Sequence, residues 1–141
     1  MGYSNKKGWI GQEEVKTFLE NVFSQQGFKF FNVNGSERSK KVLAGDVIID
    51  RKSDKNDECV LNKYFIEVKK MASPSVFSII DKATDDARWW GLRDYIAFIS
   101  RSPRGEVTTK KDRIVVMSWD TFKSLMEQLQ GYESEQSSKS K

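Results

Sequence analysis

Residues 44–50 read Ala44-Gly45-Asp46-Val47-Ile48-Ile49-Asp50, and residues 64–70 read Tyr64-Phe65-Ile66-Glu67-Val68-Lys69-Lys70. Both runs are apolar and β-branched with polar residues at their ends, a pattern that predicts two neighbouring strands of a buried sheet. Charged residues are rare in such strands, yet Asp46 begins the first run, and Glu67 and Lys69 lie two apart in the second. Because side chains alternate along a strand, Glu67 and Lys69 are expected on one face.

Further strands and helices are predicted on both sides of this stretch. Apolar residues at helical spacing predict a helix from Trp9 to about Gln26, ended by Gly27, and a second helix between Pro74 and Gly91. Apolar, β-branched runs predict strands over residues 28–33, 42–50, 63–69, 95–100 and 113–117. The polar residues 51–62 indicate a hairpin connection, which would place the third strand antiparallel beside the second.

These elements are expected to form one domain over residues 9–130. Ser118 is placed to cap a last helix. Residues 1–8 are expected to form a mobile polar arm, and residues 131–141 a disordered polar tail with little to bury. The order α-β-β-β-α-β-β-α predicts an α/β fold in which helices flank a mixed central sheet.

Composition excludes several kinds of chemistry. The 141 residues include no histidine and one cysteine, Cys59, which excludes Ser-His catalysis, His-metal nucleases, Cys/His zinc sites and an internal disulfide. The acidic neighbours of Cys59 are expected to raise the pKa of its thiol, which argues against a nucleophilic role. The formal net charge of +4 has the sign found in polyanion binders. No apolar run is long enough to span a bilayer, so we expect a soluble, intracellular, cytoplasmic protein without membrane partners, of a size that suits phage or viral origin.

Asp46, Glu67 and Lys69 would come together if their strands pair. Side chains on paired strands approach to about 5 Å, and two carboxylates that close both stay ionised only with a cation between them. Carboxylates without imidazole or thiolate favour a hard ion such as Mg²⁺ or Mn²⁺, and a water on that ion is a candidate nucleophile. Lys69 could stabilise developing negative charge or help to deprotonate that water, so the natural substrate is a phosphodiester.

With these residues in this order, the chain resembles the PD-(D/E)xK nuclease superfamily, whose restriction-endonuclease-like core is α-β-β-β-α-β. The likeness extends over roughly residues 7–100. It implies that Asp46 and Glu67 bind the metal ion, with the carbonyl of Val68 as a further ligand, and that Lys69 is the catalytic lysine. Gly45 stands where the family motif has a proline.

Within the superfamily, the chain is similar to archaeal-type and phage Holliday junction resolvases. The similarity lies in the glycine-containing basic loop at residues 34–41 and in the Lys7-Gly8 lead into a glutamate-bearing helix. The resolvase branch implies a homodimer that cuts paired strands of a four-way DNA junction. Trp89 and Trp90 lie 100° apart on their helix, so one of them could cover a dimer partner.

The superfamily also has an acid on its first helix, and two neighbouring residues compete for that place. Glu14 lies one helical turn from Ile10 and one from Phe18, at the margin of the apolar face. Glu13 points nearly opposite the apolar stripe. Periodicity therefore favours Glu14 as the fourth catalytic and metal-binding residue and leaves Glu13 as the alternative.

Basic residues collect in two segments. The first leads directly into the strand that Asp46 begins, so its side chains are placed to hold phosphates near the metal ion, although a solvated loop is an equal alternative. The candidate DNA-binding residues are Ser36, Arg38, Lys40, Lys41 and Lys70. The second segment, where charges that serve solubility also collect, includes Arg101, Arg104, Lys110 and Lys111.

The sequence thus predicts a Mg²⁺-dependent DNA endonuclease, with Mn²⁺ able to substitute, that acts as a Holliday junction resolvase. A restriction-like or repair nuclease of the same superfamily is one alternative, and a non-catalytic nucleic-acid-binding domain with this fold is another. The individual residues also have non-catalytic interpretations. Asp46 could be a turn residue, and Glu67 and Lys69 could lie on the solvated face of an edge strand.

Overall fold

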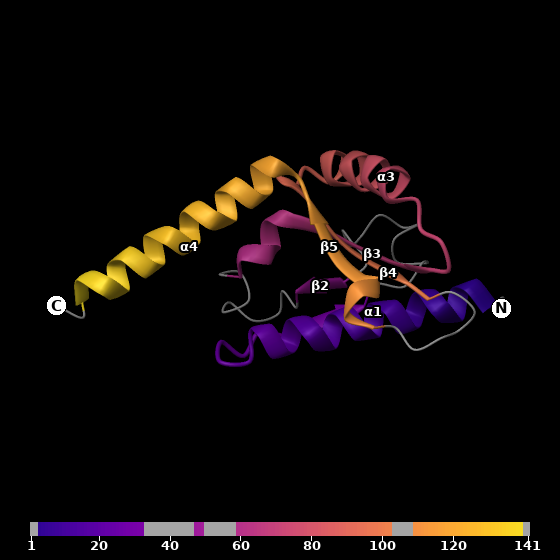
Figure 1. The fold of residues 1–141 in the computed structure, drawn as a ribbon, viewed down its shortest axis with the longest axis horizontal. Coiled ribbons are helices and arrows are strands. Elements are labelled where there is room, and N and C mark those ends of the chain that lie inside the picture. Colours follow the sequence, from indigo (N-terminus) through magenta and orange to yellow (C-terminus); the bar gives the residue numbers. More distant parts are fainter. Residues whose placement is uncertain (1–2, 33–46, 50–58, 103–108, 140–141) are drawn as a thin grey trace.

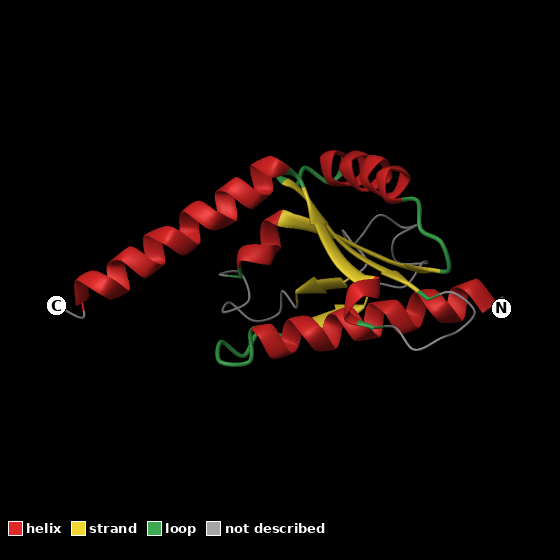
Figure 2. Ribbon diagram, in the orientation of Figure 1, coloured by secondary structure: helices red, strands yellow, loops and turns green. Residues whose placement is uncertain are grey.

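A computed structural model describes residues 3–32, 47–49, 59–102 and 109–139 of the chain (Figure 1). The predicted order of helices and strands is confirmed over these residues, and the fold is of the α/β class (Figure 2). The elements in chain order are α1 (Tyr3–Val22), β1 (Phe30–Asn32), β2 (Val47–Ile49), the 3-10 turn η2 (Val60–Lys63), β3 (Tyr64–Met71), α3 (Val76–Trp89), β4 (Asp94–Arg101), the 3-10 turn η4 (Lys110–Asp112), β5 (Arg113–Met117) and α4 (Trp119–Lys139).

The main sheet has three strands in the order β3-β4-β5. Strand β4 runs parallel to β3, from the pair Tyr64 and Asp94 to the pair Met71 and Arg101, and antiparallel to β5. A parallel pair needs a crossover connection, which α3 supplies. The predicted mixed sheet is therefore confirmed.

The partner predicted for β3 differs from the one observed. Strand β2 pairs antiparallel with β1, and within the residues that the structure describes β3 is hydrogen-bonded to β4 and has no ladder with β2. The predicted antiparallel pairing of residues 42–50 with residues 63–69 is thus not found there. Pairing with β1 buries both Phe30 and Val47 in the core beneath α1, a gain that an apolar pattern alone does not assign to a particular neighbour.

Two helices cover opposite faces of the main sheet, with α3 on one side and α1 on the other (Figure 1). Alternation along β3 divides its apolar residues between the two layers. On the α1 side the cluster includes Val15, Leu19, Tyr64, Ile66 and Val68. On the α3 side it includes Phe65, Ile79, Ala83, Ala87 and Ile99.

Gly11 lets α1 approach β3 closely. A Cβ at this position would lie 3.1 Å from the Cβ of Lys70 and 3.5 Å from Cγ1 of Val68. A side chain at this position would therefore crowd Lys70 and require a small adjustment of the helix or the strand. The helix therefore crosses β3 next to the even-numbered residues at its carboxyl end.

The ends of α3 follow their sequence signals. Ser75 is the N-cap residue, and Gly91 follows the last turn with φ of 69°. The N–H of Gly91 donates to the carbonyl of Arg88 and that of Leu92 to the carbonyl of Ala87, which is the Schellman arrangement that favours glycine. Beside this end, the Trp89 ring is 58% exposed, whereas Trp90 packs against the α3-side core.

Both ends of the chain are more helical than predicted. Helix α1 begins at Tyr3, so residues 3–8 belong to a helix rather than to a polar arm, and the helix ends at Val22, before the predicted Gln26. Helix α4 continues to Lys139, so residues 131–139 are helical rather than a disordered tail. The side chains of residues 131–138 are exposed, as predicted.

Helix α4 extends away from the sheet beyond the end of β5 (Figure 1). Ser118 caps it as predicted, because its Oγ accepts a hydrogen bond from the N–H of Thr121 at 3.1 Å. Over the described ranges, no helix combines the length and the apolar character required to cross a lipid bilayer.

Candidate active site

Strand β3 presents Glu67 and Lys69 on the α3 side of the sheet. Their neighbour Phe65 is buried in the α3-side core, and side chains two apart on a strand share a face. Nζ of Lys69 lies 3.8 Å from Oε1 of Glu67. The predicted shared face of the two residues is therefore confirmed.

The Glu67 side chain is buried, with 1% of its surface exposed. This excludes the interpretation of Glu67 as part of the solvated face of an edge strand. Taking a carboxylate out of water is costly unless cations or donors compensate it, and the Lys69 ammonium supplies one such charge. About a third of the Lys69 side chain is exposed, so an anionic group in solution can reach the ammonium.

Glu14 lies on the opposite side of β3. Its Oε1 accepts a hydrogen bond from Nζ of Lys70 at 2.5 Å, and its Oε2 accepts one from Arg113 at 3.2 Å. Lys70 is one position away from Lys69 and therefore faces α1 instead of α3. The structure thus brings Glu14 to Lys70 and Arg113 and not to Glu67.

The contact with Glu14 leaves little of Lys70, a predicted DNA-binding residue, accessible to a phosphate. Only 11% of the Lys70 side chain is exposed, and its ammonium is held by Glu14. The contact ties α1 to the carboxyl end of β3. Arg113, which begins β5, was not singled out from the sequence, where nothing distinguishes it from other surface arginines.

Glu13 lies nearer to the strands that precede β3. Its Oε1 accepts a hydrogen bond from Nδ2 of Asn32 at 2.6 Å. Asn32 is paired with Val47 in the β1–β2 ladder, and Asp46 directly precedes Val47 in the sequence. The Oδ1 atom of Asn32 is buried without a hydrogen bond from any residue that the structure describes. Of the two helix-one acids, Glu13 is therefore the one that contacts the β1–β2 pair, in which Val47 follows Asp46 directly.

Several predicted site residues lie outside the described part of the chain. These are Asp46 and the loop residues Ser36, Arg38, Lys40 and Lys41. Among the residues that are described, no three acidic or cysteine side chains lie close enough together to hold a metal ion. The predicted metal-binding set includes Asp46 and so extends beyond them. The donors of that set are all oxygens, from Asp46, Glu67, the carbonyl of Val68 and Glu14, which is the chemistry that suits Mg²⁺ or Mn²⁺. Of these, Glu14 is the one that the structure brings to Lys70 and Arg113 instead of to Glu67.

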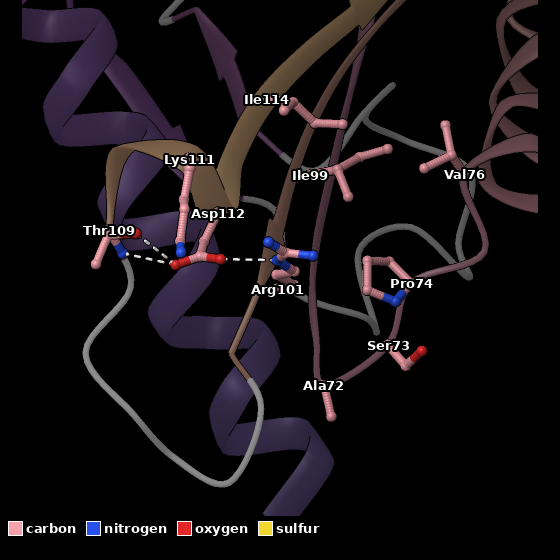
Figure 3. Close-up of a pocket in the computed structure, with 10 residues that line it drawn as sticks. All are labelled: Ala72, Ser73, Pro74, Val76, Ile99, Arg101, Thr109, Lys111, Asp112 and Ile114. Carbon is pink, nitrogen blue, oxygen red and sulfur yellow. Dashed lines mark hydrogen bonds and ion pairs between the residues drawn. The ribbon is translucent and has the colours of Figure 1, made fainter.

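A pocket of about 780 Å³ opens on the α3 side of the sheet, at the carboxyl ends of β3 and β4 (Figure 3). Ile99 lies in its wall and is paired with Lys69 of β3 on one side and with Ile114 of β5 on the other. The ten residues that line it are Ala72, Ser73, Pro74, Val76, Ile99, Arg101, Thr109, Lys111, Asp112 and Ile114. Two of the basic residues noted in the second basic segment, Arg101 and Lys111, are among them.

Hydrogen bonds fix one wall of this pocket. Nε of Arg101 donates to Oδ1 of Asp112 at 2.7 Å, and the hydroxyl of Thr109 donates to Oδ2 at 2.6 Å (Figure 3). The N–H of Thr109 donates to the same Oδ2 at 3.1 Å. The hydrogen bond from the Thr109 hydroxyl, and after it the one from Arg101, hold the pKa of Asp112 well below its usual value.

Cys59 is buried in the core on the α1 side. Burial raises the pKa of its thiol, because an apolar environment disfavours the thiolate. The expectation that Cys59 is not a nucleophile agrees with this environment.

Comparison of the chain with protein-family models, with curated proteins and with solved structures finds no match. The functional interpretation of Glu67, Lys69 and their neighbours therefore rests on the residues themselves.

Proposed function

We propose that the protein is a metal-dependent DNA endonuclease that hydrolyses phosphodiester bonds. The observation that carries the proposal is the pair formed by a buried Glu67 and a partly exposed Lys69, 3.8 Å apart on one face of a sheet strand. A buried acid beside a cation that solvent can reach suits an anionic substrate that approaches from the Lys69 side. The element order also agrees with a restriction-endonuclease-like core, which we propose for residues 3–101.

In this proposal Asp46, Glu67 and the carbonyl of Val68 hold a Mg²⁺ ion, which Mn²⁺ can replace. When bound, the ion supplies Lewis acidity to the phosphodiester. Lys69 stabilises the negative charge that develops on the phosphate and positions the attacking water. Glu67 holds the Lys69 ammonium at the mouth of the site.

Glu13 and Glu14 remain the two candidates for a further acid from α1. The contact between Glu14 and Lys70 gives Glu14 a structural role on the other face of β3. The contact between Glu13 and Asn32 favours Glu13 as the acid nearer to Asp46.

We further propose a four-way DNA junction as the substrate and a homodimer as the active form. Two cuts in paired strands need two copies of the site, and α4 offers a surface for the second copy. Its apolar residues Trp119, Phe122, Met126 and Leu129 follow one another at spacings of three, four and three, which is the a/d pattern of a coiled-coil seam. All four side chains are exposed, Trp119 to 92%.

The test is cleavage of a labelled four-way junction, of the matching linear duplex and of a flap, each with and without Mg²⁺. We expect symmetric paired nicks on the junction that require the metal ion and disappear with Lys69→Ala. Lys63→Ala, a change of an exposed lysine just before β3, is the matched control and should leave cutting unchanged.

The outcomes separate the proposal from its alternatives. Equal cutting of duplex and junction would replace the resolvase by a restriction-like or repair nuclease with the same chemistry. Junction binding without cutting under any metal condition would indicate a nucleic-acid-binding domain that is not an enzyme. If the Lys69→Ala variant still cuts DNA, Lys69 is not part of the active site.

A further inference from the structure

We infer that the pocket between residues 72–76 and η4 binds a nucleotide unit of the DNA strand through its phosphate, a few nucleotides from the bond to be cut. The inference rests on the proposed function for the identity of the strand. Its physical basis is separate, since it lies in the charge, the shape and the position of the pocket.

The pocket carries a net positive charge. Arg101 and Lys111 contribute two positive charges, and Asp112 contributes one negative charge. The bond to Asp112 uses only Nε–H of Arg101, and a guanidinium has four further N–H donors suited to a phosphate. Figure 3 shows the Arg101 guanidinium between η4 and the Pro74 side of the pocket. Asp112 therefore orients Arg101 without cancelling the positive charge of the pocket.

The pocket has room for more than a bare phosphate ion. Its volume of about 780 Å³ lies within the range of roughly 300–1,000 Å³ that holds organic ligands. The side chains of Val76, Ile99 and Ile114 provide apolar wall next to the two cations. A nucleotide has both parts, because its phosphate matches the cations and its sugar and base match the apolar wall.

The position of the pocket links it to Lys69. Lys69, Ile99 and Ile114 are neighbours across β3, β4 and β5, on the face of the sheet that carries Glu67. Arg101 lies on β4, next to β3, and two residues beyond Ile99, the partner of Lys69. With about 4.8 Å between strands and about 3.3 Å per residue, its backbone is roughly 8 Å from that of Lys69. Phosphates of one DNA strand recur about every 3.4 Å along the helix axis, so this distance corresponds to roughly two to three nucleotides.

The experiment measures binding without cleavage. Fluorescence anisotropy with a labelled DNA duplex in EDTA, over a series of salt concentrations, reports phosphate contacts directly. Each lost contact should weaken binding and reduce the slope of log affinity against log salt by about 0.9. We expect this for Lys111→Gln and for Arg101→Gln. The control, Lys82→Gln, removes an exposed charge of α3 outside the pocket and should leave both quantities unchanged.

A second variant is needed because Arg101→Gln also loses the hydrogen bond to Asp112, so weaker binding by that variant could reflect misfolding. Ser73→Asp adds a carboxylate to the exposed rim of the pocket and should weaken binding at least as much as Lys111→Gln. Ser137→Asp, near the exposed end of α4, is its charge-matched control. If Ser73→Asp and Lys111→Gln bind as the unaltered protein does, the pocket is not a strand-binding site.

Two further results keep this inference distinct from the nuclease proposal. Inorganic phosphate that shifts the amide signals of Ala72, Ser73 and residues 109–112 as strongly as the duplex does would indicate a small-anion site and overturn the strand-binding form. If the protein never cuts DNA but the pocket variants bind DNA more weakly, the pocket is a DNA-binding site and the nuclease proposal is wrong.

Discussion

Glu14 accepts a hydrogen bond from Lys70 at 2.5 Å, on the face of β3 opposite to Glu67 and Lys69. Two consecutive lysines of one strand therefore have different partners, because alternation directs Lys69 to the α3 side and Lys70 to the α1 side. The contact lies where Gly11 brings α1 close to β3. It fastens the first helix to the strand that carries the proposed active site.

Glu14→Gln is expected to lower the free energy of unfolding by about 1–2 kcal/mol, because it removes a charge-assisted hydrogen bond to a largely buried ammonium. Urea denaturation measures this loss, and a double-mutant cycle with Lys70→Met isolates the pair. Cleavage by the folded variant should stay within about tenfold of the unaltered protein, a cost of up to about 1.4 kcal/mol. Complete loss of cleavage in a folded Glu14→Gln variant would restore Glu14 as a metal ligand.

Glu67→Gln is expected to abolish Mg²⁺-dependent cleavage while the fold is retained, since the substitution keeps the shape of the buried side chain and removes its charge. Binding of Mn²⁺, followed by calorimetry, should weaken in parallel, because a carboxylate ligand is lost. The control is Glu20→Gln, a change of a glutamate of α1 that pairs with Lys16 at 3.9 Å. Unchanged Mn²⁺ affinity in Glu67→Gln would place the metal ion elsewhere.

Ser118→Ala is expected to destabilise the start of α4 by about 1 kcal/mol, the usual cost of losing an N-cap side chain. Ser118 also donates to Oδ2 of Asp94 at 2.5 Å, and Thr121 donates to the same atom at 2.8 Å. The cap therefore joins α4 to the beginning of β4. Thermal unfolding measures the loss, and Ser137→Ala at the far end of the helix should have little effect.

The contacts of Asp112 should weaken at acid pH. Its pKa is lowered in the folded state, so the ionised carboxyl stabilises the fold at pH values above the ordinary carboxyl pKa. That contribution is lost progressively as the pH falls toward the lowered pKa of the folded state. The protection of the Thr109 and Asp112 amides against hydrogen exchange, measured relative to the intrinsic exchange rate at each pH, should fall over this range. In Asp112→Asn this protection should be low at every pH, and an unchanged dependence of protection on pH in the unaltered protein would contradict the assignment.

Met126→Glu is expected to prevent dimer formation, because it places a charge in the middle of the proposed seam of α4. Sedimentation velocity with increasing protein concentration measures the dimer. Gln128→Glu, which adds the same charge on the other side of the helix, is the matched control. If the unaltered protein stays monomeric at all concentrations, α4 is not a dimer interface. The same follows if Met126→Glu leaves a dimer intact.

The sequence predicted the features that depend on local pattern. Alternation placed Glu67 and Lys69 on one face, and the caps at Ser118 and Gly91 marked the ends of helices. These signals are local, because side-chain direction and capping depend on a few neighbouring residues. Strand partners were harder to predict. The apolar pattern of β3 fits a parallel neighbour from later in the chain as well as an antiparallel one from earlier, and β4 became the partner.

The choice between Glu13 and Glu14 shows a second limit. A helical wheel ranks residues by their distance from the apolar stripe, but it does not contain the strands against which the helix packs. Glu14 reaches the end of β3, and Glu13 reaches β1. Both side chains have found polar partners, which a count of apolar neighbours cannot reveal. Likewise, the pocket arises from three separate segments and has no signature in any one of them.

The parallel register of β3 and β4 also has a consequence for how the protein is made. Glu67 pairs with Ala97, so the neighbour that helps to shield its carboxylate is synthesised only after the whole of α3. Contacts between distant residues form late, because the chain entropy of closing a long loop must first be overcome. We therefore expect a nascent chain that stops before β4 to leave Glu67 in water, so that the synthesis of β4 and the burial of this acid are coupled in time.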